Sequence, residues 1–185
     1  YAYAFSNLND LFRVQELITS INNSSGYTNP LVIAGAGPTG VELACKLSDL
    51  VNNRVSICLV DKGNKILSKS KSFNREKAID AIAKRNIKLF LKHSIKSINE
   101  NIIEISTIEV ETNNSLKIDY SGLLWTAGLR PSRLKLANHL LDENKKIKVN
   151  QFLQINEYQN IFFVGDIVFC ENHPFPSSAQ VAMQQ

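Results

Sequence analysis

Three glycines and an aspartate carry the clearest chemistry in this sequence. The glycines follow the G-x-G-x-x-G spacing in the segment Gly35-Ala36-Gly37-Pro38-Thr39-Gly40. Gly35 would allow a tight turn from strand to helix, Gly37 would let a pyrophosphate approach the backbone, and Gly40 would permit close packing of helix on strand. The following helix, with Pro38 in its first turn, would direct free N–H groups and partial positive charge at the phosphates. The segment therefore predicts a dinucleotide site.

The aspartate is Asp61, which ends a predicted strand 21 residues beyond Gly40. At that position an acid can accept hydrogen bonds from both ribose hydroxyls and repel a 2′-phosphate, which predicts a preference for NADH. Lys62 and Lys65 lie close enough in the sequence to weaken that preference. A turn-forming aspartate before Gly63 is the alternative interpretation.

Alternating helices and strands must position these residues. Apolar spacing predicts a first helix and, after a polar linker, a β-α-β-α-β unit with parallel strands and right-handed crossovers. The helices are expected over residues 7–21, 38–51 and 74–86, the linker over 22–30, and the strands over 31–34, 55–60 and 87–91.

The second half of the chain has shorter elements separated by polar turns. An antiparallel meander is expected from strands over 95–98, 102–105, 108–111 and 116–120, followed by a buried strand over 123–126. A loop and short helix, strands near 147–149, 152–155 and 161–164, and a helix beginning at Ser177-Ser178 complete the pattern. The sequence thus predicts an α/β fold with a parallel sheet and an antiparallel β-meander.

Composition narrows the function classes. The 185 residues are 44% apolar and 21% charged, and the net charge of +4 comes from scattered lysines, so no nucleic-acid partner is indicated. No apolar run approaches the roughly 20 residues of a membrane span. Cys45, Cys58 and Cys170 form neither a C-x-x-C motif nor a zinc pattern, and no metal site is expected. Cys45 and Cys58 are expected to be buried, in a protein of a reducing compartment.

Two further segments connect the glycine loop with a known family. The strand over 161–164 runs into Gly165-Asp166, and the strand over 123–126 leads into Thr126-Ala127-Gly128. Together with the glycine loop and the meander, these segments resemble the two-dinucleotide-binding-domain flavoproteins, the pyridine nucleotide-disulfide oxidoreductase superfamily. The resemblance implies a Rossmann-like three-layer FAD/NAD(P)-binding fold that binds NAD(H) at the glycine loop. It also implies cofactor contacts from Thr126, Ala127, Gly128 and Gly165, with the Asp166 carboxylate at the ribitol of FAD.

The resemblance also implies a division of the chain. Residues 1–27 would be a lead-in segment from the FAD domain, residues 28–122 the NAD(P)H-binding domain, and residues 123–185 part of the FAD-binding domain. The family has a second, N-terminal G-x-G-x-x-G that grips FAD, and this sequence has no such element. We therefore expect an internal fragment of a longer protein, which by itself retains no FAD and is inactive.

Within the superfamily, the sequence is similar to the type II NADH:quinone oxidoreductases. The likeness lies in Glu42, within Gly-Pro-Thr-Gly-Val-Glu-Leu-Ala, and in residues 174–185, Pro-Phe-Pro-Ser-Ser-Ala-Gln-Val-Ala-Met-Gln-Gln. It implies that Glu42 lies near the nicotinamide and that Gln180 and Gln184 lie beside the flavin, where the quinone arrives. As alternatives, Glu42 is an acid stabilised by the helix dipole, and the two glutamines form one polar face of a helix.

The resemblance implies an enzyme that passes a hydride from NADH to FAD and then electrons to a quinone. It further implies a cytoplasmic protein, peripheral on the inner face of a membrane through regions outside this sequence, with a homodimer as its assembly. Two alternatives stay open. One is another NAD(P)H-dependent flavoprotein reductase, of the ferredoxin or rubredoxin type, and the other is a non-catalytic module that senses NAD(H).

Overall fold

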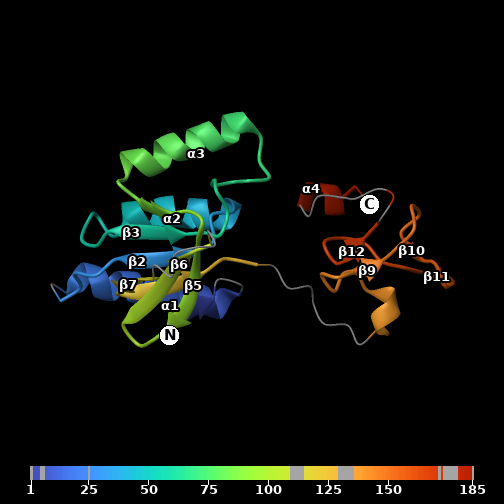
Figure 1. Ribbon diagram of the computed structural model, residues 1–185, viewed down its shortest axis with the longest axis horizontal. Helices are drawn as coiled ribbons and strands as arrows, with labels where there is room; N and C mark the ends of the chain where they lie inside the picture. Colours follow the sequence, from blue (N-terminus) through green and yellow to red (C-terminus); the bar gives the residue numbers. More distant parts are fainter. Residues whose placement is uncertain are drawn as a thin grey trace. The chain divides into compact units, whose positions relative to one another are not determined.

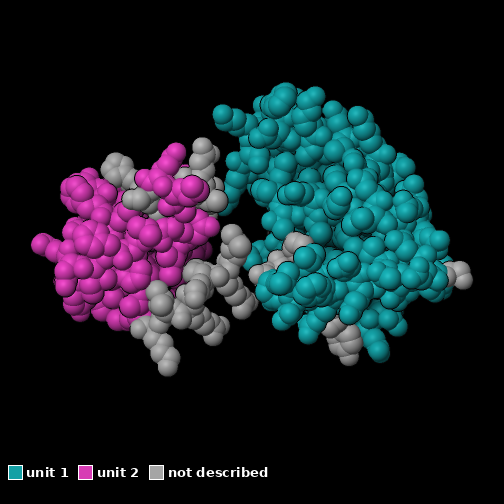
Figure 2. All heavy atoms as spheres, turned by 180° about the vertical axis from the view of Figure 1, so that it is seen from behind, with its two compact units in different colours: residues 1–128 teal, residues 129–185 magenta. Residues whose placement is uncertain are grey.

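The computed structural model describes residues 2–4, 7–24, 26–108, 115–128, 136–170, 172 and 179–184. The chain divides into two compact units, residues 1–128 and residues 129–185, which are coloured separately in Figure 2. The predicted division at residues 27 and 122 concerns cofactor domains of a longer protein, and the packing of this chain does not test it.

The first unit is built on a five-stranded parallel sheet in the order β1-β8-β2-β3-β4, of which β2 and β3 are labelled in Figure 1. The strands are β1 (Ala2–Ala4), β2 (Leu31–Ala34), β3 (Ile57–Val60), β4 (Lys88–Phe90) and β8 (Gly122–Trp125). Every neighbouring pair is parallel, and β2 pairs with β3 in the register Leu31 to Ile57. The predicted parallel pairing of the strands around the glycine loop is therefore confirmed, although β3 begins two residues later than expected.

Helices cover one face of this sheet and the meander covers the other (Figure 1). Side chains of a strand alternate between the two faces, so consecutive residues of β2 and β3 enter different cores. The core on the helix side includes Leu31, Ile33, Ile57 and Leu59 together with buried residues of α1 (Leu8–Asn23), α2 (Pro38–Leu50) and α3 (Ser72–Lys84). The core on the meander side includes Val32, Ala34, Cys58 and Val60 together with Ile103 and Ile105. The unit thus has the three layers that the sequence predicted.

The meander has three strands, β5 (His93–Ile98), β6 (Ile102–Thr107) and β7 (Ser115–Asp119), in the order β5-β6-β7. Both pairs are antiparallel, and the register shifts between Ile95 and Ser97. The sequence predicted separate strands over 102–105 and 108–111. Instead β6 continues to Thr107, because its residues pair with β5 as far as His93, and residues 109–111 lie outside the described part of the chain.

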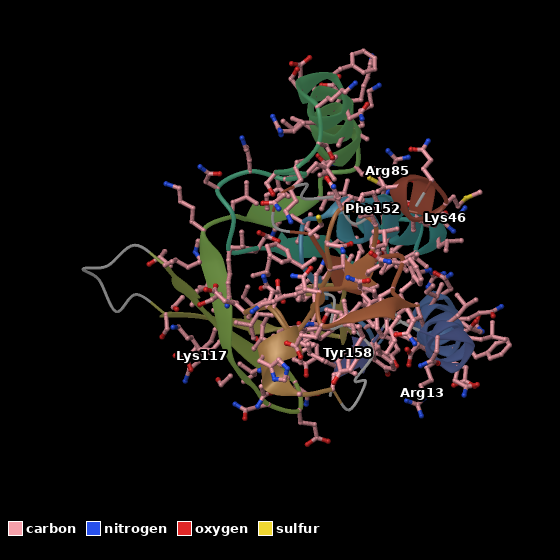
Figure 3. All side chains as sticks on the ribbon, turned by 90° about the vertical axis from the view of Figure 1, so that its right-hand side faces the viewer. Arg13, Lys46, Arg85, Lys117, Phe152 and Tyr158 are labelled. Atoms are coloured by element: carbon pink, nitrogen blue, oxygen red, sulfur yellow. The ribbon has the colours of Figure 1, made fainter. Side chains whose placement is uncertain are left out.

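The ends of the helices follow local chemistry. Asn7 caps α1: its Oδ1 accepts from the Asp10 N–H at 3.1 Å, and the Asp10 carboxylate accepts from the Asn7 N–H at 3.2 Å. Helix α3 ends at Lys84, two residues earlier than expected, because Asn86 adopts a left-handed conformation with φ of 52°. Arg85, labelled in Figure 3, follows α3 and donates to both carboxylate oxygens of Asp49 on α2, at 2.8 and 3.0 Å. This hydrogen-bonded guanidinium holds the pKa of Asp49 below its usual range.

The second unit has small sheets around its own core. It contains η1 (Asn138–Leu140), β9 (Ile147–Lys148), β10 (Gln154–Ile155), β11 (Tyr158–Phe162), β12 (Val168–Phe169) and α4 (Ala179–Ala182). Strands β9 and β12 pair in parallel, and β10 and β11 pair antiparallel around a core of Ile147, Val149, Ile155, Val168 and Cys170. The strand expected over 161–164 lies earlier, because β11 pairs with β10 through Tyr158 and Phe162. The predicted helix start at Ser177-Ser178 lies outside the described residues.

Candidate functional site

A cavity of about 380 Å³ lies at the carboxyl ends of the parallel strands β8, β2 and β3. Its lining consists of Ala34, Gly35, Val60, Asp61, Lys62, His93, Ser94, Ile95, Trp125, Ala127 and Gly128. The strand order departs from the chain order between β2 and β8. Open α/β sheets bind ligands outside the carboxyl ends of their strands at such a point, and this volume falls within the usual range of ligand pockets.

The glycine loop joins β2 to α2 beside this cavity. Gly35 has a φ of 108°, and a Cβ there would lie 2.9 Å from the Ala127 nitrogen. A Cβ at Gly40 would collide with the carbonyl oxygen of Gly35. Only glycine therefore fits both positions, and the tight turn and close packing expected of Gly35 and Gly40 are present.

Gly37 differs from the other two glycines of the loop. It is exposed, has a φ of −75°, and in the described part of the chain no atom outside residues 36–38 lies within 4 Å of a Cβ built on it. No packing within the described residues requires glycine here, which leaves room for a ligand to approach the backbone. Pro38 and Thr39 are exposed in the first turn of α2, and Gly37 is its N-cap without a side-chain cap bond.

Asp61 ties the glycine loop to the turn that follows β3. Its Oδ2 accepts from the Ala36 N–H at 2.6 Å, and its Oδ1 accepts from the Gly63 N–H at 2.5 Å. The Leu67 N–H also donates to the Ala36 carbonyl at 2.9 Å. Within the chain, Asp61 thus makes the contacts expected of a turn-forming aspartate. Each carboxylate oxygen has a second lone pair, so binding of ribose by Asp61 stays a prediction.

The segment Thr126-Ala127-Gly128 packs against the same loop, although it lies about 90 residues further along the chain. Thr126 donates its hydroxyl to the Ala34 carbonyl at 2.8 Å, and the Thr126 N–H donates to the same oxygen at 2.9 Å. The Trp125 indole N–H donates to the Ala127 carbonyl at 2.9 Å, and Gly128 has a φ of 77°. Tertiary structure therefore brings two of the predicted cofactor segments together.

Glu42 and Lys65 are not brought into the cavity. Glu42 is exposed on α2 and is not among the lining residues; it lies beyond the first helical turn, where the dipole effect has fallen off. Lys62 lines the cavity, whereas Lys65 is exposed and does not. The roles expected of Glu42 and Gly37 in binding stay predictions.

The residues predicted to lie beside the flavin and the quinone belong to the second unit. Gly165 has a φ of 85° and Asp166 is exposed, in the turn between β11 and β12. Gln180 lies in α4, but α4 ends at Ala182, and Gln184 is exposed in a following turn in which its N–H donates to the Val181 carbonyl at 3.0 Å. The described helix therefore does not include Gln184, and the helix face that the two glutamines were expected to share is not seen.

Sequence reasoning missed several side chains that line the cavity, among them His93 and Trp125. The His93 Nδ1 lies 2.6 Å from the Leu91 carbonyl oxygen, and its ring meets the Phe90 ring edge-on with centroids 5.9 Å apart. Both residues could have been found from the sequence. Trp125 lies near the end of the strand predicted over 123–126, and His93 closely follows the strand predicted over 87–91. Parallel strands place their carboxyl ends at one edge of the sheet.

The described residues also bear on three other properties: metal binding, membrane crossing and thiol reactivity. Among them, no group of three His, Cys, Asp or Glu side chains could hold a metal ion. In the same part of the chain, no helix has the length and apolar character needed to cross a membrane. Cys45, Cys58 and Cys170 are free thiols; Cys58 and Cys170 are buried and Cys45 is partly buried. Burial raises the pKa of both Cys45 and Cys58.

Comparison with known proteins gives consistent matches. The sequence profile described as pyridine nucleotide-disulphide oxidoreductase matches residues 6–185. The chain is 28% identical over 190 residues to demethylphylloquinone reductase NdbB of Synechocystis sp., an alignment that covers 100% of this chain and 46% of that protein. It is 29% identical over 171 residues to the type II NADH:quinone oxidoreductase of Staphylococcus aureus, covering 84% of this chain and 41% of that protein. The chain thus spans less than half the length of these curated relatives.

A solved structure has the same fold. NDH2 from Plasmodium falciparum in complex with NADH matches this chain with a TM-score of 0.78 and 21% identity, over 92% of this chain and 40% of that chain. At this identity the likeness concerns the fold alone, which is of the α/β Rossmann type.

Proposed function

Because this chain belongs to the pyridine nucleotide-disulphide oxidoreductase family, we propose that its first unit binds NADH in the cavity beside the glycine loop. We propose further that the whole protein is a type II NADH dehydrogenase, which passes a hydride from NADH to FAD and then electrons to a quinone. The names of two relatives, a demethylphylloquinone reductase and a type II NADH:quinone oxidoreductase, support a quinone as the acceptor.

The observation that supports this proposal best is the glycine loop. Gly35 and Gly40 are required by packing within the chain, whereas Gly37 is open on the side where a Cβ would project. A pyrophosphate beside Gly37 would meet the first N–H groups of α2, which have no partners within the helix. The residues present therefore fit a dinucleotide.

In this proposal the chain binds and orients, while NADH and FAD, when bound, supply the redox chemistry. The loop from Gly35 to Gly40 holds the pyrophosphate, and Asp61 accepts from the adenosine ribose. Ala127 and Gly128 line the cavity after β8, and Thr126 bonds to the end of β2 beside the glycine loop. Glu42, on the exposed face of α2, lies toward the nicotinamide.

The flavin and quinone contacts are assigned to the second unit. The proposed domains are a lead-in over 1–27, an NAD(P)H-binding domain over 28–122 and part of an FAD-binding domain over 123–185. Asp166 binds the ribitol of FAD, with Gly165 forming its turn, and Gln180 and Gln184 lie on the quinone side. The proposal includes a cytoplasmic protein, peripheral on the inner face of a membrane, and a homodimer.

Anaerobic rapid mixing of the whole protein would test the function. NADH is expected to bleach the flavin absorbance, and a soluble quinone such as menadione is expected to restore it. Restoration by ferredoxin but not by menadione would contradict the quinone assignment. A protein whose flavin NADH does not bleach would contradict the dehydrogenase assignment as well.

Two variants of the whole protein would test the second unit. Asp166→Ala is expected to lower flavin occupancy, because a charged acceptor at the ribitol is lost. Gln184→Ala is expected to leave flavin bound and to raise the KM for quinone, whereas Gln151→Ala, at another exposed glutamine, leaves both unchanged. Weaker NADH binding in Gln184→Ala, with unchanged quinone kinetics, would refute the acceptor-side assignment.

A further inference from the structure

His93 lines the cavity on the side of β3 and β5, next to Asp61. The His93 N–H donates to the Asp61 carbonyl at 3.0 Å, so the two backbones are joined where both residues reach the cavity wall. His93 is partly buried, and its ring is fixed by the edge-on contact with Phe90. Its position is therefore set by the fold and not by a ligand.

The contacts of the His93 ring fix its tautomer. Nδ1 lies 2.6 Å from the Leu91 carbonyl oxygen, which can only accept a hydrogen bond, so Nδ1 must carry the proton. In the neutral imidazole, Nε2 is then an acceptor. The fold thus places a ring with one remaining polar atom, a lone-pair acceptor, in the wall of the cavity.

The neighbouring wall is also rich in acceptors. Asp61, whose backbone carbonyl accepts from the His93 N–H, lines the same wall, and the Trp125 indole N–H, a donor, is already bonded to the Ala127 carbonyl. Lys62 is the one lysine or arginine among the described lining residues; it is exposed, so its attraction for a phosphate is screened by salt. Such a wall suits the hydroxyl and amino donors of an adenosine and opposes a 2′-phosphate, which only accepts.

We propose that His93 is a second specificity-determining residue for the nucleotide, a role that rests on the proposed binding of NADH. Its Nε2 accepts a hydrogen bond from the adenosine half of the dinucleotide. Together with Asp61, it disfavours the 2′-phosphate of NADPH. The preference for NADH is therefore built from two acceptors on adjacent segments and not from Asp61 alone.

Calorimetric titration with NAD⁺ and NADP⁺, which bind without reducing flavin, tests this in the whole protein. His93→Phe keeps the ring packing and removes both nitrogens, and is expected to raise the Kd for NAD⁺ by about threefold to tenfold, the effect of one net hydrogen bond. In His93→Gln the side-chain amide can accept or donate. This variant is expected to keep NAD⁺ binding within about twofold of wild type and to lower the Kd for NADP⁺. His139→Gln, at an exposed histidine of the second unit, is the matched control and is expected to change neither.

Nitrogen NMR of histidine-labelled wild-type protein gives a readout independent of any variant. The His93 signal, assigned by its loss in His93→Gln, is expected to show the Nδ1–H tautomer and a shift of Nε2 when NAD⁺ is added. An Nε2–H tautomer, or an unchanged ratio of the two Kd values in both variants, would overturn the proposal while NAD⁺ binding stands. If wild-type protein binds neither nucleotide, the proposed binding of NADH is refuted, and the role of His93, which rests on it, is refuted as well.

Discussion

Gly37 and Gly40 allow the binding role of the glycine loop to be separated from its role in folding. Gly37 has φ of −75° and ψ of −176°, which alanine adopts without strain, and a Cβ there would meet no atom of the described chain within 4 Å apart from those of residues 36–38. Reduced freedom of the unfolded chain stabilises Gly→Ala by about 0.4–1 kcal/mol. The poorer N-cap preference of alanine costs a similar amount. The free energy of unfolding of Gly37→Ala should therefore stay within about 1 kcal/mol of wild type.

The same substitution at Gly40 should act on the fold. Its Cβ would collide with the Gly35 carbonyl oxygen and would also lie 2.8 Å from the Thr126 hydroxyl. Both partners are fixed, because the loop is bonded to Asp61 and to Thr126. Overpacking of this kind typically costs about 1–3 kcal/mol. Gly40→Ala should therefore lower the free energy of unfolding by at least that amount.

The affinity for the nucleotide, in contrast, should fall in Gly37→Ala, the variant whose stability changes little. A methyl group at Gly37 occupies the space through which a pyrophosphate reaches the first N–H groups of α2, and the loss of one charge-assisted hydrogen bond weakens binding by about tenfold or more. The assays are urea unfolding and NAD⁺ titration of the whole protein. Gly26→Ala, in the exposed linker, is the control: it should leave the NAD⁺ affinity unchanged and keep the free energy of unfolding within about 1 kcal/mol of wild type. Folded Gly37→Ala protein that binds NAD⁺ with wild-type affinity would refute the placement of the pyrophosphate.

Three further predictions concern packing and ionisation. Ile103→Ala should lower the free energy of unfolding by about 2–5 kcal/mol, because the Ile103 side chain is 0% exposed between the sheet and the meander. Ile102 is 37% exposed, so Ile102→Ala should lower the free energy of unfolding much less in the same urea titration. Thr126→Val should cost about 1 kcal/mol, since the Ala34 carbonyl loses its hydroxyl donor; unchanged stability would contradict this. Burial raises the pKa of the Cys58 thiol, so it should resist iodoacetamide until the chain unfolds. For the same reason, its contribution to stability should be lost as the pH rises from the ordinary thiol pKa toward the raised value of the folded protein.

The sequence alone was enough to predict the parallel unit around the glycine loop. The apolar run 31–34, the glycine spacing and the acid at Asp61 are local signals, and each element they predict is present. The predicted meander is also present, but its strand limits are not those expected. Pairing with β5 extends β6 to Thr107, and pairing of this kind depends on residues that are distant in the sequence.

The second unit was harder to predict for the same reason. Strand β12 has two residues and exists only through its pairing with Ile147 and Lys148 of β9, so no periodicity indicates it. Helix α4 has four residues, too few for local propensity to decide where it ends, and the helix expected to reach Gln184 stops at Ala182.

The residues expected to bind a dinucleotide could be recognised in the sequence, because the glycine spacing and an acid at the end of a strand are local features of the chain. Their mutual arrangement was decided by tertiary structure. Crossover connections bring Thr126 and Gly35 into contact across about 90 residues, and they lead Asp61 to accept from the Ala36 N–H. His93 entered the cavity in the same way. Its neighbours in sequence fix its tautomer, but only the alignment of parallel strand ends at one edge of the sheet places it beside Asp61.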